Sequence, residues 1–142
     1  MKILKINRAI VVFAVLAAMS GSGLAGPDVL NLNGWSLRQA GASEWLPAEV
    51  PGCVHTDLLS NGKIQEPFFR LNERGQQWID KTEWEYRTAF NLGADALLKE
   101  RIELVFEGLD TYADVYLNES LVLSADNMFR EWRLEAKPLL RF

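Results

Sequence analysis

Carboxylates are the most numerous groups in this sequence that could do chemistry. The chain has 19 acidic residues and a single histidine, His55. Hydrolysis of a glycosidic bond generally uses two carboxyl groups flanking that bond, one protonated and one ionised. The acidic residues of the strand-like segments, such as Glu83, Glu85 and Glu103, alternate with apolar residues, so we expect them to face solvent. We therefore expect no complete catalytic carboxylate pair in this chain.

His55 and Cys53 do not complete any other reactive arrangement. One histidine excludes a histidine pair as metal ligands, and neither a G-x-S-x-G sequence nor a glycine-rich phosphate loop occurs. Cys53 lies between Gly52 and Val54, so we expect it to be a small packed residue rather than a nucleophile. The sequence predicts no bound metal ion and no cofactor.

Trp78 lies in a group of residues suited to binding a neutral polar ligand. Its neighbours include Gln76, Gln77 and Asp80. A flat apolar ring beside hydrogen-bonding groups is the combination that sugar sites use. These residues belong to a polar stretch, residues 65–81, that shows no sustained helical or strand period. Its aromatic residues argue against disorder, so we expect an ordered loop.

The elements that would position this loop are mostly short strands. Apolar residues alternate with polar ones within residues 30–39, 83–90, 101–107, 111–117, 120–123 and 132–135. Trp35, Trp84 and Trp132 lie in these segments and are expected to be buried. A short helix is expected at 55–61, capped by Thr56, and a helical or turn segment at 94–99. The pattern predicts an all-β sandwich or jelly roll.

Turn residues set the expected strand ends. Asn118 and Glu119 predict a tight hairpin between residues 111–117 and 120–123. Gly108, Leu109 and Asp110 predict a turn after residues 101–107. In the clearest strand, residues 83–90, the alternation predicts that Trp84 and the residues at 86, 88 and 90 face the core.

Residues 1–25 have the order of basic, apolar and small residues that is typical of a secretory signal peptide. The apolar run is shorter than the roughly 20 residues that cross a bilayer as a helix, so we expect cleavage after Ala25 rather than an anchor. Removal takes away three positive charges and moves the formal net charge from −4 to −7. We expect a secreted or periplasmic protein, residues 26–142, that binds neither nucleic acid nor membrane.

The order of several motifs resembles the amino-terminal domain of glycoside hydrolase family 2, and most closely its β-mannosidase branch. The broad family pattern is Phe-Glu-Gly-Leu-Asp-Thr-Tyr-Ala at 106–113, and the motifs at 50–59, 77–79 and 127–130 point to the branch. Cys53 departs from the expected Thr. The motifs are Leu-Asn-Gly-Trp at 32–35, Val-Pro-Gly-Cys-Val-His-Thr-Asp-Leu-Leu at 50–59, Glu-Pro-Phe-Phe-Arg at 66–70, Gln-Trp-Ile at 77–79, Trp-Glu-Tyr-Arg-Thr at 84–88 and Asn-Met-Phe-Arg at 127–130.

The resemblance implies a galactose-binding-like jelly roll, followed in the longer protein by an immunoglobulin-like sandwich and a (β/α)₈ barrel. Enzymes of this family retain the anomeric configuration and use two Glu about 5 Å apart on the barrel. Neither Glu is expected in this chain, which would contact the barrel within one polypeptide. The loop before residue 84 would reach the barrel pocket, so Asn72, Gln77 and Trp78 are the predicted substrate-binding residues. The implied substrate is a β-mannoside oligosaccharide.

Two alternatives remain open at this stage. Another family 2 exo-glycosidase, such as an exo-β-glucosaminidase, would share the same jelly roll. A free-standing carbohydrate-binding module would instead have a complete sheet and its own sugar affinity. Residues 139–142 end the chain on mainly apolar residues without a turn, so we expect the jelly roll to be incomplete at its C-terminus.

Overall fold

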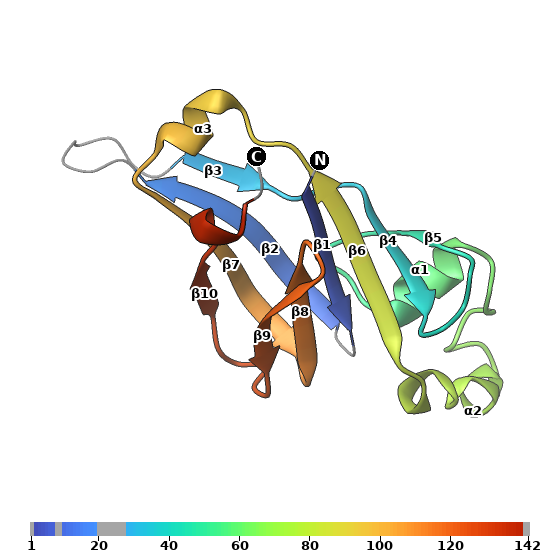
Figure 1. Ribbon diagram of the computed structural model, residues 1–142. Coiled ribbons are helices and arrows are strands. Elements are labelled where there is room, and N and C mark those ends of the chain that lie inside the picture. The colour runs from blue at the N-terminus through green and yellow to red at the C-terminus, as the bar shows by residue number, and fades with distance from the viewer. Residues whose placement is uncertain (1, 8–9, 20–27, 141–142) are drawn as a thin grey trace.

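The computed structural model describes residues 2–7, 10–19 and 28–140. Within them, ten strands form two sheets (Figure 1). Sheet A has the order β5-β4-β6-β1-β8-β9, and sheet B has the order β10-β7-β2-β3. The strands are β1 (Lys2–Asn7), β2 (Ile10–Met19), β3 (Asp28–Asn31), β4 (Trp35–Gln39), β5 (Leu46–Ala48), β6 (Trp84–Phe90), β7 (Arg101–Asp110), β8 (Ala113–Leu117), β9 (Ser120–Ala125) and β10 (Trp132–Glu135).

All paired strands are antiparallel, which confirms the predicted all-β class. Apolar side chains of both sheets meet in one core. The alternation places Trp84, Tyr86, Thr88 and Phe90 of β6 inward, as predicted. β7 contributes the fully buried residues Ile102, Leu104 and Phe106. Trp35 is buried as expected, whereas Trp132 is only partly buried.

The predicted leader residues supply two strands. β1 lies between β6 and β8 in sheet A, and β2 lies between β7 and β3 in sheet B. Leu4 and Ile6 of β1 are fully buried. The structure describes the unprocessed chain, so cleavage after Ala25, which lies outside the described residues, stays a prediction.

The hairpin between β8 and β9 forms as predicted. Asn118 and Glu119 have φ angles of 49° and 69°, the left-handed pair that two-residue hairpins require. The predicted turn at Gly108, Leu109 and Asp110 is wrong, because β7 continues through Asp110. Pairing of Leu109 and Asp110 with β2 holds this end of β7 in the sheet, which the sequence of β7 alone does not show.

The predicted short helix is α1 (Val54–Ser60), which begins one residue earlier than expected. Cys53 occupies the cap position, and Thr56 acts from the third helical residue: its hydroxyl accepts a hydrogen bond from the Cys53 N–H at 3.2 Å. A Cβ at Gly52 would lie 2.3 Å from the Glu49 carbonyl oxygen, so the turn before the helix requires glycine. Gly62, with φ 66°, supplies the left-handed residue after the helix.

The stretch 65–81 is ordered, as predicted, but it is not free of secondary structure. It contains α2 (Asn72–Gln76) and the 3-10 helix η1 (Ile79–Lys81). Figure 1 shows α2 beyond the end of sheet A at which β6 begins, far from α3 (Ala94–Leu98). A second 3-10 helix, η2 (Lys137–Leu139), follows β10. In the described part of the chain, no helix is long and apolar enough to span a bilayer.

Candidate functional site

A polar pocket of about 320 Å³ lies where the 65–81 loop meets the start of α1. It is the candidate ligand site. Most of its lining side chains carry hydrogen-bonding groups. The lining residues are His55, Pro67, Glu73, Gln76, Gln77, Asp80 and Lys81.

Hydrogen bonds within the loop give this pocket its shape. The Asn72 side-chain amide donates to the Glu66 carbonyl at 2.9 Å, and the Gln76 amide donates to the Gln65 carbonyl at 2.8 Å. The Phe69 N–H also donates to the Glu66 carbonyl, at 3.2 Å. Side-chain amides therefore close the loop on itself between residues 65 and 76.

Gln76 offers an acceptor that the described residues leave unsatisfied. The residue is 8% exposed, and its Oε1 is buried without a hydrogen-bond partner in the described part of the chain. An unpaired buried acceptor costs about 1–3 kcal/mol, so this amide oxygen lowers the stability of the folded loop. With the carboxylates of Glu73 and Asp80, the pocket is rich in acceptors. Groups of this kind bind hydroxyl-rich neutral molecules.

The three predicted substrate-binding residues have different contacts in the structure. Gln77 lines the pocket. Asn72 is committed to closing the loop, and Trp78 packs against Trp84 with ring centroids 5.9 Å apart. Trp78 is nevertheless 42% exposed, so its ring remains accessible. Contact of these residues with a sugar stays a prediction.

His55 and Glu73 are pocket residues that sequence reasoning missed. His55 was expected only to start the helix, and it lies at the pocket because α1 and the loop pack together. Gln76 and Asp80 stood out only as neighbours of Trp78. Among the described residues, no group of three or more His, Cys, Asp or Glu is placed to hold a metal ion.

A buried network fixes α1, and therefore His55, relative to sheet A. The Tyr86 hydroxyl donates to Asp57 Oδ2 at 2.9 Å, and the Glu49 N–H donates to Asp57 Oδ1 at 3.0 Å. Burial raises the pKa of Asp57 and outweighs these two donors, which lower it. Burial also raises the pKa of Tyr86, and the neighbouring Asp57 raises it further. The network ties the helix to β6 and to the segment after β5.

A second hollow, of about 390 Å³, lies on sheet A around Trp45. The guanidinium carbons of Arg38 and Arg87 lie 4.4 and 3.8 Å from the Trp45 ring centroid. Glu85 is 7% exposed, which corrects the expectation that it faces solvent. Its carboxylate pairs with Lys5 Nζ at 2.9 Å and Arg38 Nε at 2.5 Å. Burial opposes ionisation of Glu85, but the hydrogen bonds from Lys5 and Arg38 outweigh it and lower its pKa.

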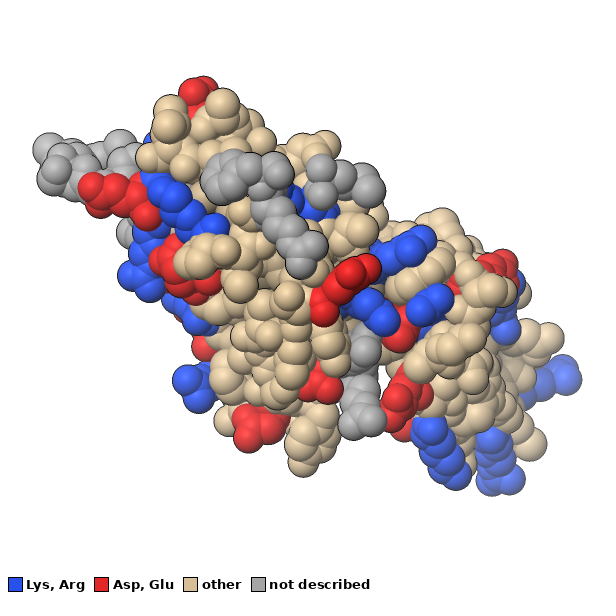
Figure 2. All heavy atoms as spheres, in the orientation of Figure 1, with Lys and Arg blue, Asp and Glu red and all other residues tan. Residues whose placement is uncertain are grey.

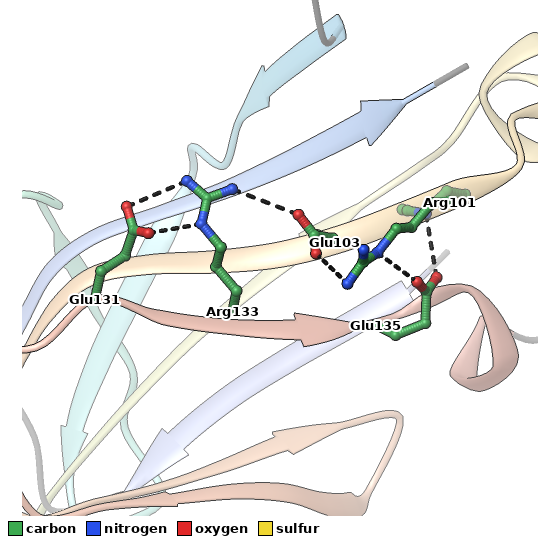
Figure 3. Close-up of polar contacts among 6 residues, drawn as sticks. Arg101, Glu103, Glu131, Arg133 and Glu135 are labelled. Atoms are coloured by element: carbon green, nitrogen blue, oxygen red, sulfur yellow. Dashed lines mark hydrogen bonds and ion pairs between the residues drawn. The ribbon is translucent and has the colours of Figure 1, made fainter. Parts of the chain in front are cut away.

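Glu103 is the second acidic residue wrongly expected to face solvent, since it is 5% exposed. Figure 3 shows it between Arg101 of β7 and Arg133 of β10, at 2.7 and 3.4 Å. Each arginine has a further carboxylate partner, Glu135 for Arg101 and Glu131 for Arg133. Cross-strand pairing covers a carboxylate that the pattern of β7 alone would leave in solvent. Figure 2 likewise shows acidic and basic side chains side by side on the face that it draws.

Comparison with known proteins shows the family of the chain. Residues 35–142 match the family described as glycosyl hydrolase 2 galactose-binding domain-like. The chain belongs to this family. The match covers the candidate pocket and every strand from β4 to β10, and it confirms the predicted galactose-binding-like fold.

The relatives of this galactose-binding-like domain include β-mannosidases. The β-mannosidase of Bos taurus is 38% identical over 123 residues, which are 85% of this chain and 14% of the relative. β-Mannosidase B of Emericella nidulans is 40% identical over 106 residues, which are 72% of this chain and 12% of the relative. A crystal structure of β-D-mannosidase from Dictyoglomus thermophilum matches with a TM-score of 0.75 and 41% identity, covering 78% of this chain and 14% of that one. The chain therefore spans about 14% of the bovine relative.

Proposed function

We propose that this chain is the amino-terminal, non-catalytic part of a β-mannosidase. The longer protein would remove terminal, non-reducing β-D-mannose residues from oligosaccharides and retain the anomeric configuration. The observation that carries the proposal is the 41% identity to a solved β-mannosidase over 78% of this chain at a TM-score of 0.75. The other 86% of that chain leaves room for a separate reaction centre.

The contacts of the chain's buried carboxylates support a non-catalytic role for this domain. Asp57 accepts hydrogen bonds from Tyr86 and Glu49, and Glu85 and Glu103 each pair with two basic side chains. Carboxylates engaged in this way stabilise a fold rather than hold a mobile proton for a leaving group. A scaffold role for this domain is consistent with these contacts.

The candidate pocket would serve the same reaction as a substrate-binding surface. Gln77 lines it, and Trp78 and Asn72 lie on the same loop. Acceptors such as the Glu73 and Asp80 carboxylates would receive sugar hydroxyl donors, and the exposed part of the Trp78 ring would cover a sugar face. The longer protein would be exported after removal of residues 1–25 and act in the periplasm or outside the cell.

The test is to express the full reading frame and measure turnover of aryl β-mannoside, β-glucosaminide, β-galactoside and β-glucuronide. We expect turnover of the mannoside, with β-mannose as the first product by proton NMR. Preferential turnover of the glucosaminide would favour the exo-β-glucosaminidase alternative. A reading frame without a barrel, together with sugar binding by the isolated domain, would favour the binding-module alternative.

A further inference from the structure

The outer face of sheet A carries a second, separate place where a small molecule can bind. Two hollows of about 390 and 310 Å³ lie there, and Ile3 and Arg87 line both of them. We call the two hollows together the outer groove. Each volume falls within the roughly 300–1,000 Å³ of small-molecule sites. The outer groove shares no lining residue with the polar pocket between the 65–81 loop and α1.

The floor of the outer groove is a row of side chains across three neighbouring strands. Arg87 of β6 pairs with Lys5 of β1, which pairs in turn with Tyr116 of β8. These strands lie side by side in sheet A (Figure 1). The backbones of Arg87 and Tyr116 are therefore about 10 Å apart, two strand spacings. Their neighbours Tyr86 and Val115 fill the core, so the row faces away from the core.

Trp45 forms one wall of the outer groove and is held by two arginines. Arg38 and Arg87 both stack on its ring. Arg38 is otherwise engaged, because its Nε pairs with Glu85 at 2.5 Å and its Nη1 donates to the Ala42 carbonyl at 2.9 Å. Arg38 therefore positions the ring and has few donors left for a ligand.

Arg87 keeps its hydrogen-bond donors available. Its side chain is exposed and, within the described residues, makes no hydrogen bond or ion pair beyond its contact with the Trp45 ring. A guanidinium presents its N–H groups as a planar fork that matches a carboxylate through two parallel hydrogen bonds. Glu119 lines the same hollow, and the described part of the chain gives it no ion pair with Arg87. The groove thus presents one cationic and one anionic group that a ligand could engage.

We infer that the outer groove binds an acidic sugar, a pyranose that carries a carboxylate. The Arg87 fork donates to that carboxylate, and Glu119 accepts hydrogen bonds from the sugar hydroxyls. Trp45 and Tyr116 provide the aromatic surface that the apolar face of a sugar ring requires. A carboxylate without hydroxyl groups would leave Glu119 unmatched, and a doubly charged anion would be repelled by it.

The four groups that make these contacts lie within residues 35–142, the segment that matches the family. Ile3 and Lys5 of β1 complete the lining in the unprocessed chain, but the inference assigns them no contact with the ligand. It also does not depend on mannoside hydrolysis, because the outer groove and the candidate pocket are separate.

The test is a calorimetric titration of the full-length protein with methyl β-D-glucuronide and with methyl β-D-glucoside. The two probes differ only in a carboxylate in place of the hydroxymethyl group. We expect the glucuronide to bind at least about tenfold more tightly, because only it offers a charged partner to Arg87. Arg87→Met should weaken glucuronide binding about tenfold or more, and Arg87→Lys, which keeps the charge without the fork, should weaken it several-fold.

Arg130→Met is the matched control. The Arg130 guanidinium also stacks on a tryptophan, at 4.3 Å from the Trp132 ring centroid, but it does not line the outer groove. This variant should change glucuronide binding by less than about twofold. Equal losses in Arg87→Met and Arg130→Met would overturn the inference, because a general charge effect would then explain both.

Three further results would overturn the inference: equal affinity for the two probes, unchanged glucuronide binding in Arg87→Met, or displacement of the glucuronide by an equal concentration of acetate. The last result would mean that the anion alone is recognised and the sugar is not. Turnover of aryl β-mannoside is measured separately. Its absence in a protein that binds glucuronide through Arg87 would sink the proposed function alone, and normal turnover without glucuronide binding would sink this inference alone.

Discussion

The Tyr86 hydroxyl donates a hydrogen bond to Asp57 inside the core, at 2.9 Å, and joins β6 to α1. Tyr86 is fully buried, and Asp57 is 4% exposed. The pair joins residues 29 positions apart in the sequence, on a strand and on a helix that also carries the pocket residue His55. Its loss should therefore affect both stability and the pocket.

Tyr86→Phe in the 142-residue chain should lower the free energy of unfolding by about 1–3 kcal/mol. The substitution keeps the ring but leaves a buried carboxylate short of one donor. Urea denaturation followed by tryptophan fluorescence measures the change. Tyr116→Phe, at a partly exposed position, is the matched control and should change stability by less than about 0.5 kcal/mol. Equal effects of the two substitutions would contradict the stabilising role of the Tyr86 hydroxyl.

The pH dependence of that stability follows from Asp57. Burial raises its pKa in the folded chain above the ordinary 3.8, so the folded state binds the proton more tightly than the unfolded state. Its contribution to stability is therefore full below the unfolded value and is lost as the pH rises through the folded value. Tyr86→Phe removes a donor to the carboxylate and should raise the pKa of Asp57 in the folded chain further. The pH range over which this stability is lost should therefore extend to higher pH. Urea denaturation between pH 3 and 7 measures the free energy of unfolding of both variants. The same pH dependence in Tyr86→Phe as in the parent chain would contradict the role given to Asp57.

Glu85 should show the opposite pH response. Its pKa is lowered because Lys5 and Arg38 together outweigh burial, so its contribution is present above the ordinary 4.5 and is lost as the pH falls through the folded value. Arg38→Met should lower the free energy of unfolding at pH 7 by about 1.5–3 kcal/mol, since a charged hydrogen bond to a buried carboxylate is lost.

Lys63→Met is the matched control for Arg38→Met. Lys63 pairs with Glu44 at 3.1 Å, but their side chains are 43% and 66% exposed. Solvent screens such a pair, so the loss should be at most about 1 kcal/mol. Denaturation at pH 7 compares the two variants. A larger loss for Lys63→Met would show that burial does not set the strength of these pairs.

Glu103→Gln should destabilise the chain more than Glu131→Gln does. Glu103 is buried and pairs with Arg101 of its own strand and with Arg133 of β10, whereas Glu131 lies outside the sheet and pairs with Arg133 (Figure 3). We expect about 1–2 kcal/mol for Glu103→Gln. Denaturation at low and at 1 M salt checks this, since screening should shrink the difference. A greater loss for Glu131→Gln would contradict it.

Trp78→Ala in the full-length protein should raise KM or lower kcat/KM for aryl mannosides, because an exposed ring on the pocket loop is removed. Gln77→Ala, which removes one hydrogen-bonding group of the pocket, should lower kcat/KM about two- to tenfold. Phe129→Ala is the matched control for the ring, since it is 90% exposed on a different loop. Unaltered kinetics of Trp78→Ala and Gln77→Ala would remove these residues from the site.

Local patterns in the sequence determined most of the strand layout. The alternation in β6 and the left-handed pair Asn118 and Glu119 depend on neighbouring residues, and both were predicted correctly. The capping interaction of Thr56 with Cys53 is equally local, since three positions separate them. Motif order was enough to indicate the family, because its motifs lie on these same short elements.

Tertiary structure decided the burial of charged residues and the lining of the pocket, because both depend on residues that are distant in the sequence. Glu85 and Glu103 are buried because neighbouring strands bring Arg38 and Arg133 to them, and a two-residue period cannot reveal such partners. His55 and Gln77 line one pocket although they are 22 positions apart, and amide side chains shape the loop that carries Gln77. The sequence by itself determined the strands from β6 to β10, whereas β1 and β2 formed in residues predicted to be a leader. The pairing of the strands decided which polar groups are buried. The physical reason is range: strand and turn preferences act between adjacent residues, whereas burial and pocket geometry arise from contacts across the sheets.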